Sequence, residues 1–325
     1  MDEKVQVKVE EPTKLYKAHI ICSISYLAII GSLIRNGLDL FFKNDVNSLE
    51  SPNSVFVLAS VANMFGCFVM GWLFVKDKPK TPQYIGLTTG LCGSITTYSK
   101  FNHQASLLFL GKSSLETPNS QVNAVFAIIV WLHVSMSSWT VGKDLSCKFK
   151  NDFLAKDFRK NSFFLSLTVL LLLIIVLVIL LVLYFPENTS LSTICFSGLL
   201  APLGGLMRYY LGQHVPRFSC KKIPILTLIP TGTLVANFIG SMLLSLLYVL
   251  EQVYVTSPNQ KMFVVGVSSG FLACLTTVSS FVNEVQILRI KSLKASYLYI
   301  TLTLVLCISI SCITIGIASI FLESL

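Results

Sequence analysis

The chain contains one motif twice, and this repeat constrains its fold more than any other feature. Residues 86–101 and 266–281 align without gaps. The two copies share the identical pairs Gly86/Gly266, Gly90/Gly270, Thr96/Thr276, Thr97/Thr277, Ser99/Ser279 and Phe101/Phe281. Each copy begins with small residues and runs into Thr-Thr-x-Ser-x-Phe, a polar segment between apolar ones. Polar residues that interrupt a helix at membrane depth occur where they face protein or a water-filled path.

The composition of the chain is that of a membrane protein. It is 53% hydrophobic and 13% charged, and residues 165–184 carry no charged side chain. About 20 consecutive apolar residues make one transmembrane helix, whereas a soluble protein of this length needs far more charge to cover its surface. We therefore expect a polytopic membrane protein and not a soluble enzyme. The polar start, Met1-Asp-Glu-Lys4, predicts no cleaved signal peptide.

Apolar segments predict nine transmembrane helices, at 17–42, 54–75, 83–110, 121–142, 162–185, 191–214, 225–250, 261–289 and 295–322. The tail before the first segment and the loops after the second, fourth, sixth and eighth hold 19 of the 25 Lys and Arg residues. Cytosolic loops are enriched in Lys and Arg. We therefore expect a cytosolic N-terminus and an external C-terminus; insertion in the plasma membrane is a separate expectation. The sequon at Asn188 falls on the expected external side.

Two further motifs recur in the same order, which identifies an internal duplication. Gly31-Ser-Leu-Ile-Arg35 matches Gly204-Gly-Leu-Met-Arg208, and Val61-Ala-Asn63 matches Val235-Ala-Asn237; with the opening motif, the offsets are 173, 174 and 180 residues. Each repeat holds four spans, so one extra span between them inverts the second repeat relative to the membrane. We expect an all-α protein with a cytosolic tail at 1–16, a four-helix repeat at 17–150, a linker helix at 151–188 and an inverted four-helix repeat at 189–325. The third helix of each repeat is expected to be broken.

Polar side chains inside the spans leave several interpretations open. An arginine at membrane depth is functional or paired, so Arg35 and Arg208 either anchor to carbonyl groups at a helix end or form an electropositive vestibule. Asn63 and Asn237 need hydrogen-bond partners, and they join helices, satisfy the backbone at a helix break or line a pore. The Thr-Thr-x-Ser segments offer hydroxyl donors for an anion, and carbonyls freed at the break can bind a cation.

Motifs for catalysis are absent from the sequence. The nine cysteines are scattered without metal-ligand spacing, and we expect them to be reduced packing groups. Asp39 and Glu284 are the candidate carboxylates for proton coupling, but both lie near span ends, and His133 in the fourth span has no match in the ninth. No nucleophile–base pair, phosphate-binding loop or metal-ligand cluster is recognisable. We therefore predict that the chain is not an enzyme.

These blocks resemble the fluoride channel family, which includes the bacterial Fluc/CrcB proteins and the eukaryotic fluoride exporters. The family pattern has Arg after a Gly-rich segment, Asn-x-x-Gly in the second helix, and Gly-x-x-Thr-Thr-Phe-Ser-x-Phe followed by Glu in the third. The matches are Arg35 and Arg208, Asn63–Gly66 and Asn237–Gly240, and Gly93–Phe101 and Ala273–Phe281, with Gln104 and Glu284 at the acidic position. Bacterial members are antiparallel dimers of four-span chains, and a fused double repeat resembles the eukaryotic form.

The resemblance implies a passive, selective fluoride channel that works as a single fused chain in the lipid bilayer, binds no nucleic acid and needs no higher oligomer. It implies pore positions at Asn63, Asn237, Tyr98, Phe101, Val278 and Phe281, with Thr97, Thr277, Ser99 and Ser279 beside them and Tyr299 and Thr303 as the polar track of the ninth helix. It also implies a structural Na⁺ ion at the centre, held by backbone carbonyls of Gly93, Thr96, Ala273 and Thr276. It gives vestibule or structural roles to Arg35, Arg208, Lys100 and Glu284.

The two repeats depart from the family pattern in different ways. Val278 lacks the expected ring and Tyr98 adds a hydroxyl, while Ala273, Gln104 and Lys100 also break the pattern. This asymmetry leads to the hypothesis that one pathway conducts and the other is degraded. A proton-coupled secondary transporter of a small solute, built on inverted repeats, is the alternative function. A membrane scaffold without transport is a third interpretation.

Overall fold

A computed structural model describes residues 13–45, 54–74, 81–112, 119–148, 162–184, 189–218, 223–254 and 256–323. These residues form helices and no β-strand, in agreement with the predicted all-α class. The first half holds α1 (Lys14–Asp45), α2 (Ser54–Trp72), α3 (Pro82–Ile85), the π-helix η2 (Gly86–Cys92), α4 (Gly93–Ile95), α5 (Ser99–Phe109) and α6 (Ser120–Lys148). Helix α7 (Ser162–Tyr184) follows it.

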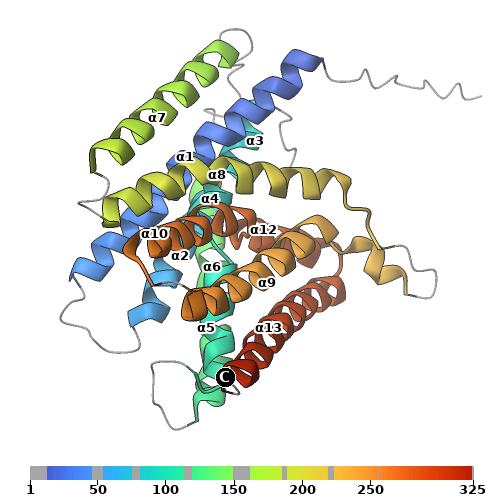
Figure 1. Cartoon of the computed structure of the whole chain (residues 1–325). Helices are drawn as coiled ribbons and strands as arrows, with labels where there is room; N and C mark the ends of the chain where they lie inside the picture. Colours follow the sequence, from blue (N-terminus) through green and yellow to red (C-terminus); the bar gives the residue numbers. More distant parts are fainter. Residues whose placement is uncertain are drawn as a thin grey trace, which may run out of the picture.

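The second half repeats this order of elements (Figure 1). It holds α8 (Thr189–His214), the 3-10 helix η4 (Pro224–Leu228), α9 (Thr231–Tyr254), α10 (Pro258–Val267), the π-helix η5 (Ser268–Leu272), α11 (Ala273–Leu275), α12 (Ser279–Lys291) and α13 (Leu293–Glu323). Most of the predicted tail at 1–16, the sequon at Asn188 and the basic residues Lys76, Lys78 and Lys80 lie outside the described residues.

Seven helical segments of the described chain are long and apolar enough to cross a membrane. They are Lys14–Phe42, Ser120–Lys148, Phe163–Tyr184, Ser190–His214, Thr231–Tyr254, Asn259–Lys291 and Leu293–Ala318. The expected second span holds only a shorter apolar helix, Val61–Trp72. The expected third span is divided between α3, η2, α4 and α5, and α5 is its polar part, with Lys100 at its second position.

Helix α9 begins later than the predicted start of the seventh span at residue 225. Residue Ile229 is extended, with φ −66° and ψ 129°, and it follows the 3-10 helix η4. Pro230 comes next in the sequence, and a residue before proline is pushed out of the helical conformation. The helix therefore begins after this proline, at Thr231.

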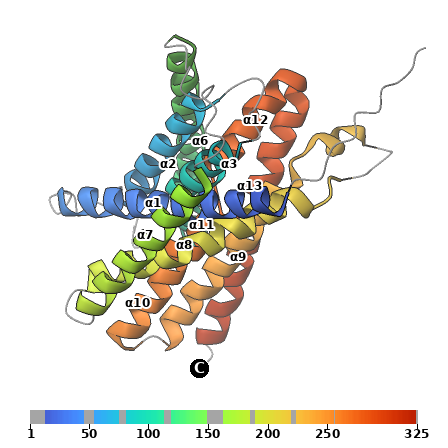
Figure 2. The same cartoon turned by 90° about the horizontal axis from the view of Figure 1, so that it is seen from above.

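Helix α7 lies at the edge of the molecule, beside α1 and α8 (Figures 1 and 2). Only 11% of its most apolar window is buried, and its mean hydropathy there is 3.5. Side chains such as Phe164, Leu165 and Val182 are exposed. A helix that is apolar on all sides and still exposed fits contact with lipid.

Matched glycines let α1 and α8 approach the interrupted helices closely. A Cβ atom on Gly31 of α1 would lie 2.6 Å from the carbonyl oxygen of Leu91 in η2. A Cβ atom on Gly204 of α8 would overlap the carbonyl oxygen of Phe271 in η5. Both glycines and both carbonyls are matched pairs of the two repeats, so the same close packing occurs twice.

We predict that Gly31→Ala and Gly204→Ala each destabilise the protein by about 1–3 kcal/mol, because the added methyl group overpacks a backbone contact. Gly37→Ala in α1 and Gly212→Ala in α8 are matched controls, since a Cβ atom at either position meets nothing within 4 Å. Thermal unfolding of the detergent-solubilised protein measures the difference. Equal melting temperatures for Gly204→Ala and Gly212→Ala would contradict the close packing.

Candidate functional site at the interrupted helices

Both copies of the repeated motif interrupt their helices at the same place. The interruptions cover residues 96–98, between α4 and α5, and residues 276–278, between α11 and α12. Their first residues are extended, with φ −87° and ψ 150° at Thr96 and φ −89° and ψ 154° at Thr276. The breaks predicted from the polar motif are therefore present in both copies.

The two interruptions contact each other through threonine and serine hydroxyls. Thr96 Oγ1 lies 3.1 Å from Ser279 Oγ, and Thr276 Oγ1 lies 3.0 Å from Ser99 Oγ. The backbone N–H of Ser279 donates to Thr96 Oγ1 at 3.2 Å, and that of Ser99 donates to Thr276 Oγ1 at 3.1 Å. Since the first N–H groups of a helix lack partners within it, each threonine caps the helix of the opposite half.

Asn63 and Asn237 satisfy the backbone of the interruptions. The N–H of Thr97 donates to Asn63 Oδ1 at 2.9 Å, and Asn63 Nδ2 donates to the Thr97 carbonyl at 3.3 Å. Asn237 makes the same pair of bonds with Thr277, at 2.8 and 3.2 Å. These contacts match the interpretation in which the asparagines satisfy the backbone at a helix break. An amide nitrogen carries two N–H groups, so each asparagine retains one, and its role in lining a pore stays a prediction.

Arg35 lies inside the protein against carbonyl groups of both halves. Its side chain is 1% exposed. It donates to the carbonyl of Ser94 in α4 and to the carbonyl of Ser269 in η5. Its Nη2 also donates to Ser32 Oγ at 3.2 Å. A guanidinium has donors fixed in a planar fork, and here that fork joins two helices from opposite halves.

Arg208 makes the matching contacts and adds two more. It donates to the carbonyls of Cys274 and Thr89, which are the repeat equivalents of the two carbonyls that Arg35 contacts. Its Nη1 also donates to the carbonyl of Gly93 at 3.0 Å and to that of Thr276 at 3.2 Å. The structure thus agrees with the interpretation in which both arginines anchor to carbonyls at a helix end.

The sodium site that the resemblance implies shares its ligands with Arg208. Unwound backbone carbonyls and helix C-terminal ends are suitable Na⁺ ligands. Among the described residues, no three His, Cys, Asp or Glu side chains come together as an alternative ligand set. Two of the four implied positions, Gly93 and Thr276, already offer their carbonyls to the guanidinium. In this arrangement the four positions do not fit a sodium ion.

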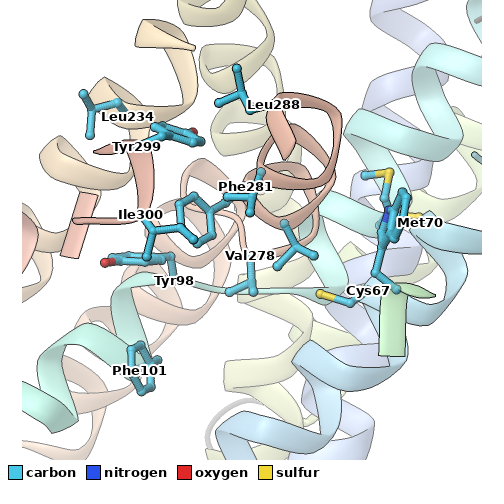
Figure 3. Packing of buried hydrophobic residues seen from close by; sticks show 14 of the residues in the cluster. Cys67, Met70, Tyr98, Phe101, Leu234, Val278, Phe281, Leu288, Tyr299 and Ile300 are labelled. Carbon is cyan, nitrogen blue, oxygen red and sulfur yellow. The ribbon is translucent and has the colours of Figure 1, made fainter. Parts of the chain in front are cut away.

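An aromatic row connects the first interruption to a carboxylate of the second half. The rings of Tyr98 and Phe281 have centroids 6.1 Å apart, and those of Phe281 and Tyr299 are 5.2 Å apart (Figure 3). Tyr299 Oη donates to Glu284 Oε2 at 2.7 Å, and Thr233 Oγ1 donates to Glu284 Oε1 at 2.7 Å. Hydroxyls and ring edges therefore follow one another along this side.

Two further contacts extend this polar side along α9 and α13. Tyr98 Oη donates to the carbonyl of Thr303 at 3.4 Å, and the hydroxyl of Thr303 donates to the carbonyl of Tyr299 at 2.8 Å. Thr233 lies one helical turn before Asn237 on α9. Thr233 was not among the residues predicted from the sequence, although its four-residue spacing from Asn237 places both on one helix face.

On the matched side, Val278 lies near Cys67 (Figure 3). Both belong to a buried cluster that also includes Met70, Trp131 and Trp139 as well as the rings of the first side. Trp131 stacks on Phe101, with ring centroids 3.8 Å apart and an angle of 3°. Gln104, the repeat equivalent of Glu284, has a buried Oε1 atom without a hydrogen-bond partner in the described part of the chain. The tryptophans of α6 carried no signal in the sequence beyond aromatic residues at helical spacing.

Two cavities flank the interruptions, and they are lined by equivalent positions of the two repeats. The larger, of about 440 Å³, is lined by Lys100 and Ser269, and the smaller, of about 170 Å³, by their equivalents Ser280 and Thr89. Lys100 Nζ forms an ion pair with Asp39 Oδ2 at 3.1 Å beside the larger cavity. Glu284 lines the smaller one.

We predict that Thr276→Val and Thr96→Val each lower the free energy of unfolding by about 1–3 kcal/mol, because each leaves a buried N–H of the opposite helix without an acceptor. Thr314→Val is the control, since that hydroxyl donates only within its own helix, to the carbonyl of Ile310. Thermal unfolding of the purified protein measures the cost. Stability equal to that of the control variant would show that the crossed hydroxyl contacts do not join the two halves.

The chain is similar to proteins of one family along most of its length. The family model described as CrcB-like protein, Camphor Resistance (CrcB), matches residues 22–139 and 195–317. Fluoride export protein 1 of Candida albicans is 29% identical over 324 residues, covering 89% of this chain and 77% of that protein. Fluoride export protein 1 of Neurospora crassa is 27% identical, and the match covers 82% of this chain but only 61% of that protein.

A bacterial relative matches a smaller part of the chain. The fluoride-specific ion channel FluC of Shewanella woodyi is 39% identical over 121 residues, which is 36% of this chain and 89% of that protein. The match therefore has about the length of one repeat. No solved structure matches the chain significantly.

Proposed function

This chain belongs to the CrcB-like protein family, and on that premise we propose that it is a passive fluoride channel that exports the anion from the cytosol. The observation that carries the proposal is that the family match falls on both repeats. Relatives that match nearly the whole chain are named fluoride export proteins, and a relative that matches about one repeat is named a fluoride-specific ion channel. We assign no enzymatic activity to it.

A passive channel suffices for this task. Fluoride enters cells from acidic surroundings as neutral HF, which crosses lipid, and it ionises in the near-neutral cytosol. A membrane potential that is negative inside drives an anion outward with about 2.3 kcal/mol per 100 mV. No coupling carboxylate is needed for this transport, so protection against fluoride toxicity follows from selective permeation alone.

The architecture that we propose has nine membrane helices in two inverted repeats, at 17–150 and 189–325, joined by a linker helix within 151–188. The reciprocal contacts support it: Thr96 caps α12 as Thr276 caps α5, and Arg35 and Arg208 contact equivalent carbonyls. A fused pair of this kind works as one chain. Charge placement supports an N-terminus in the cytosol and a C-terminus outside, and the plasma membrane is the location that we propose.

Of the two pathways, we propose that the one along Tyr98, Phe281 and Tyr299 conducts. Fluoride is small and strongly hydrated, so its water must be replaced by close hydrogen-bond donors and positive ring edges. This side offers the ring edges of Tyr98, Phe281 and Tyr299, with Asn237 on the same face of α9 as Thr233. The hydroxyls of Tyr299, Thr233 and Thr303 line it and donate to Glu284 or to a backbone carbonyl. The other side has Val278 where this one has the ring of Tyr98, and we propose that it is the degraded pathway.

The proposal includes no central sodium ion. The resemblance implies one at the backbone carbonyls of Gly93, Thr96, Ala273 and Thr276, but Gly93 and Thr276 offer their carbonyls to Arg208.

We predict that the purified chain in liposomes releases fluoride but not chloride when a potassium ionophore removes the opposing voltage. At a fixed voltage the rate should not change when the proton gradient is dissipated, because the anion moves alone. An ion-selective electrode measures the efflux. Release that stops with the proton gradient would favour the secondary transporter, and an absence of release together with normal growth of deletion cells on fluoride would favour the scaffold.

We predict unequal effects of matched substitutions in the two pathways. Asn237→Asp should abolish efflux, because it replaces an N–H donor by a negative charge on a side that already holds the Glu284 carboxylate, whereas Asn63→Asp should leave most of it. Tyr98→Val should reduce efflux about tenfold or more, which corresponds to roughly 1.4 kcal/mol, and Val278→Ala should change it little.

The liposome assay compares these four variants at equal protein amounts, and gel filtration checks that each one is folded. Cells that carry both aspartate substitutions should become sensitive to fluoride. Equal partial losses from Asn63→Asp and Asn237→Asp would contradict a single conducting pathway, and wild-type resistance of the double variant would contradict both asparagine assignments.

A further inference from the structure

The guanidinium groups of Arg35 and Arg208 form a second, independent connection between the halves. Each donates to a carbonyl near the end of the interrupted helix in its own half, at Ser94 or Cys274. Each also donates to a carbonyl of the π-helix in the opposite half, at Ser269 or Thr89. These are equivalent positions of the two repeats, so the arrangement is reciprocal.

The charge of the two guanidinium groups is balanced by backbone dipoles. Among the described residues neither group contacts a carboxylate, and the ion pair found there joins Lys100 to Asp39 instead. The carbonyl ends of two helices converge on the arginines, and a helix C-terminus attracts positive charge. Arg35 is 1% exposed and Arg208 4% exposed, so neither group has access to water in place of these carbonyls.

A sequence difference between the repeats explains why Arg208 contacts more backbone carbonyls than Arg35, whose other partners are Ser32 Oγ and Cys274 Sγ. Position 93 is glycine, and a Cβ atom there would overlap the guanidinium of Arg208. The absence of a side chain therefore lets Arg208 reach the Gly93 carbonyl. The equivalent residue of the second repeat is Ala273, and the described contacts of Arg35 do not include its carbonyl. The departure of position 273 from the repeat pattern thus coincides with the smaller number of carbonyl contacts.

We infer that Arg208, with Arg35 as its counterpart, serves as the internal cation that joins the broken helices, in place of a sodium ion. Arg208 uses the carbonyls of Gly93 and Thr276, two of the positions at which the ion is expected. A sodium ion there would lie beside two fixed positive charges in a medium of low dielectric constant, where like charges repel strongly. The joint therefore needs no metal, and its stability is independent of sodium.

The test measures the melting temperature of the full-length purified protein in sodium chloride and in N-methyl-D-glucamine chloride at equal ionic strength, without fluoride. We expect the same melting temperature for the wild type in both salts. A saturable rise with sodium would overturn the inference. Because the readout is stability without fluoride, its outcome is separate from that of the transport experiments.

Variants of Arg208 test whether the melting temperature depends on its side chain. Arg208→Met should lower the melting temperature by several degrees in the sodium-free buffer, and Arg208→Lys should recover part of the loss while remaining insensitive to sodium, since it keeps the charge. Arg217→Met, at an exposed basic residue, is the matched control and should change nothing. An Arg208→Met protein as stable as the control would overturn the inference, whereas a loss restored by added sodium would support it by showing that the ion occupies the vacated carbonyls.

If Arg208→Met does not fold, Gly93→Ala tests the same contact with both arginines kept. Its methyl group should displace the guanidinium from the Gly93 carbonyl and lower the melting temperature relative to Gly37→Ala, whose added methyl group meets nothing within 4 Å. Equal melting temperatures of these two variants would overturn the assignment of Gly93 as the position that admits Arg208.

Discussion

The structure depends on one physical constraint, which is that backbone groups freed at a helix break must find partners away from water. Each interruption frees N–H and carbonyl groups that its own helix cannot satisfy. Thr96 and Thr276 satisfy N–H groups of the opposite half, and Arg35 and Arg208 contact carbonyls of both halves. Neither half is complete without the other, so the breaks that weaken two helices are also what holds the halves together.

The two repeats make the same contacts at this joint and different contacts away from it. At the joint, equivalent residues make equivalent bonds, as Asn63 and Asn237 do with the following threonines. Away from it, Glu284 accepts two hydroxyl donors, whereas Gln104 has a buried oxygen without a partner among the described residues. Contacts that satisfy the backbone are thus alike in the two repeats, while side chains farther from the joint differ.

The arginines show how a costly residue at membrane depth is accommodated. Sequence reasoning left two roles open for them, an anchor and an electropositive vestibule. The guanidinium N–H groups donate to backbone carbonyls, so both arginines have a structural role. Lys100 instead lines the larger cavity and pairs with Asp39. The positive charges that line an open space in this region are therefore lysines, Lys100 and Lys261.

The sequence by itself determined the membrane class, the duplication and the position of both breaks, because composition and motif spacing are local properties of the chain. It also identified Asn63, Asn237, Arg35 and Arg208 as residues that require partners. Only the tertiary structure decided which partners they have. Those outcomes depend on residues far apart in the chain, such as Tyr98 beside Phe281 and Arg208 beside Gly93. Local patterns do not encode which distant carbonyl or ring comes within reach after the halves pack together.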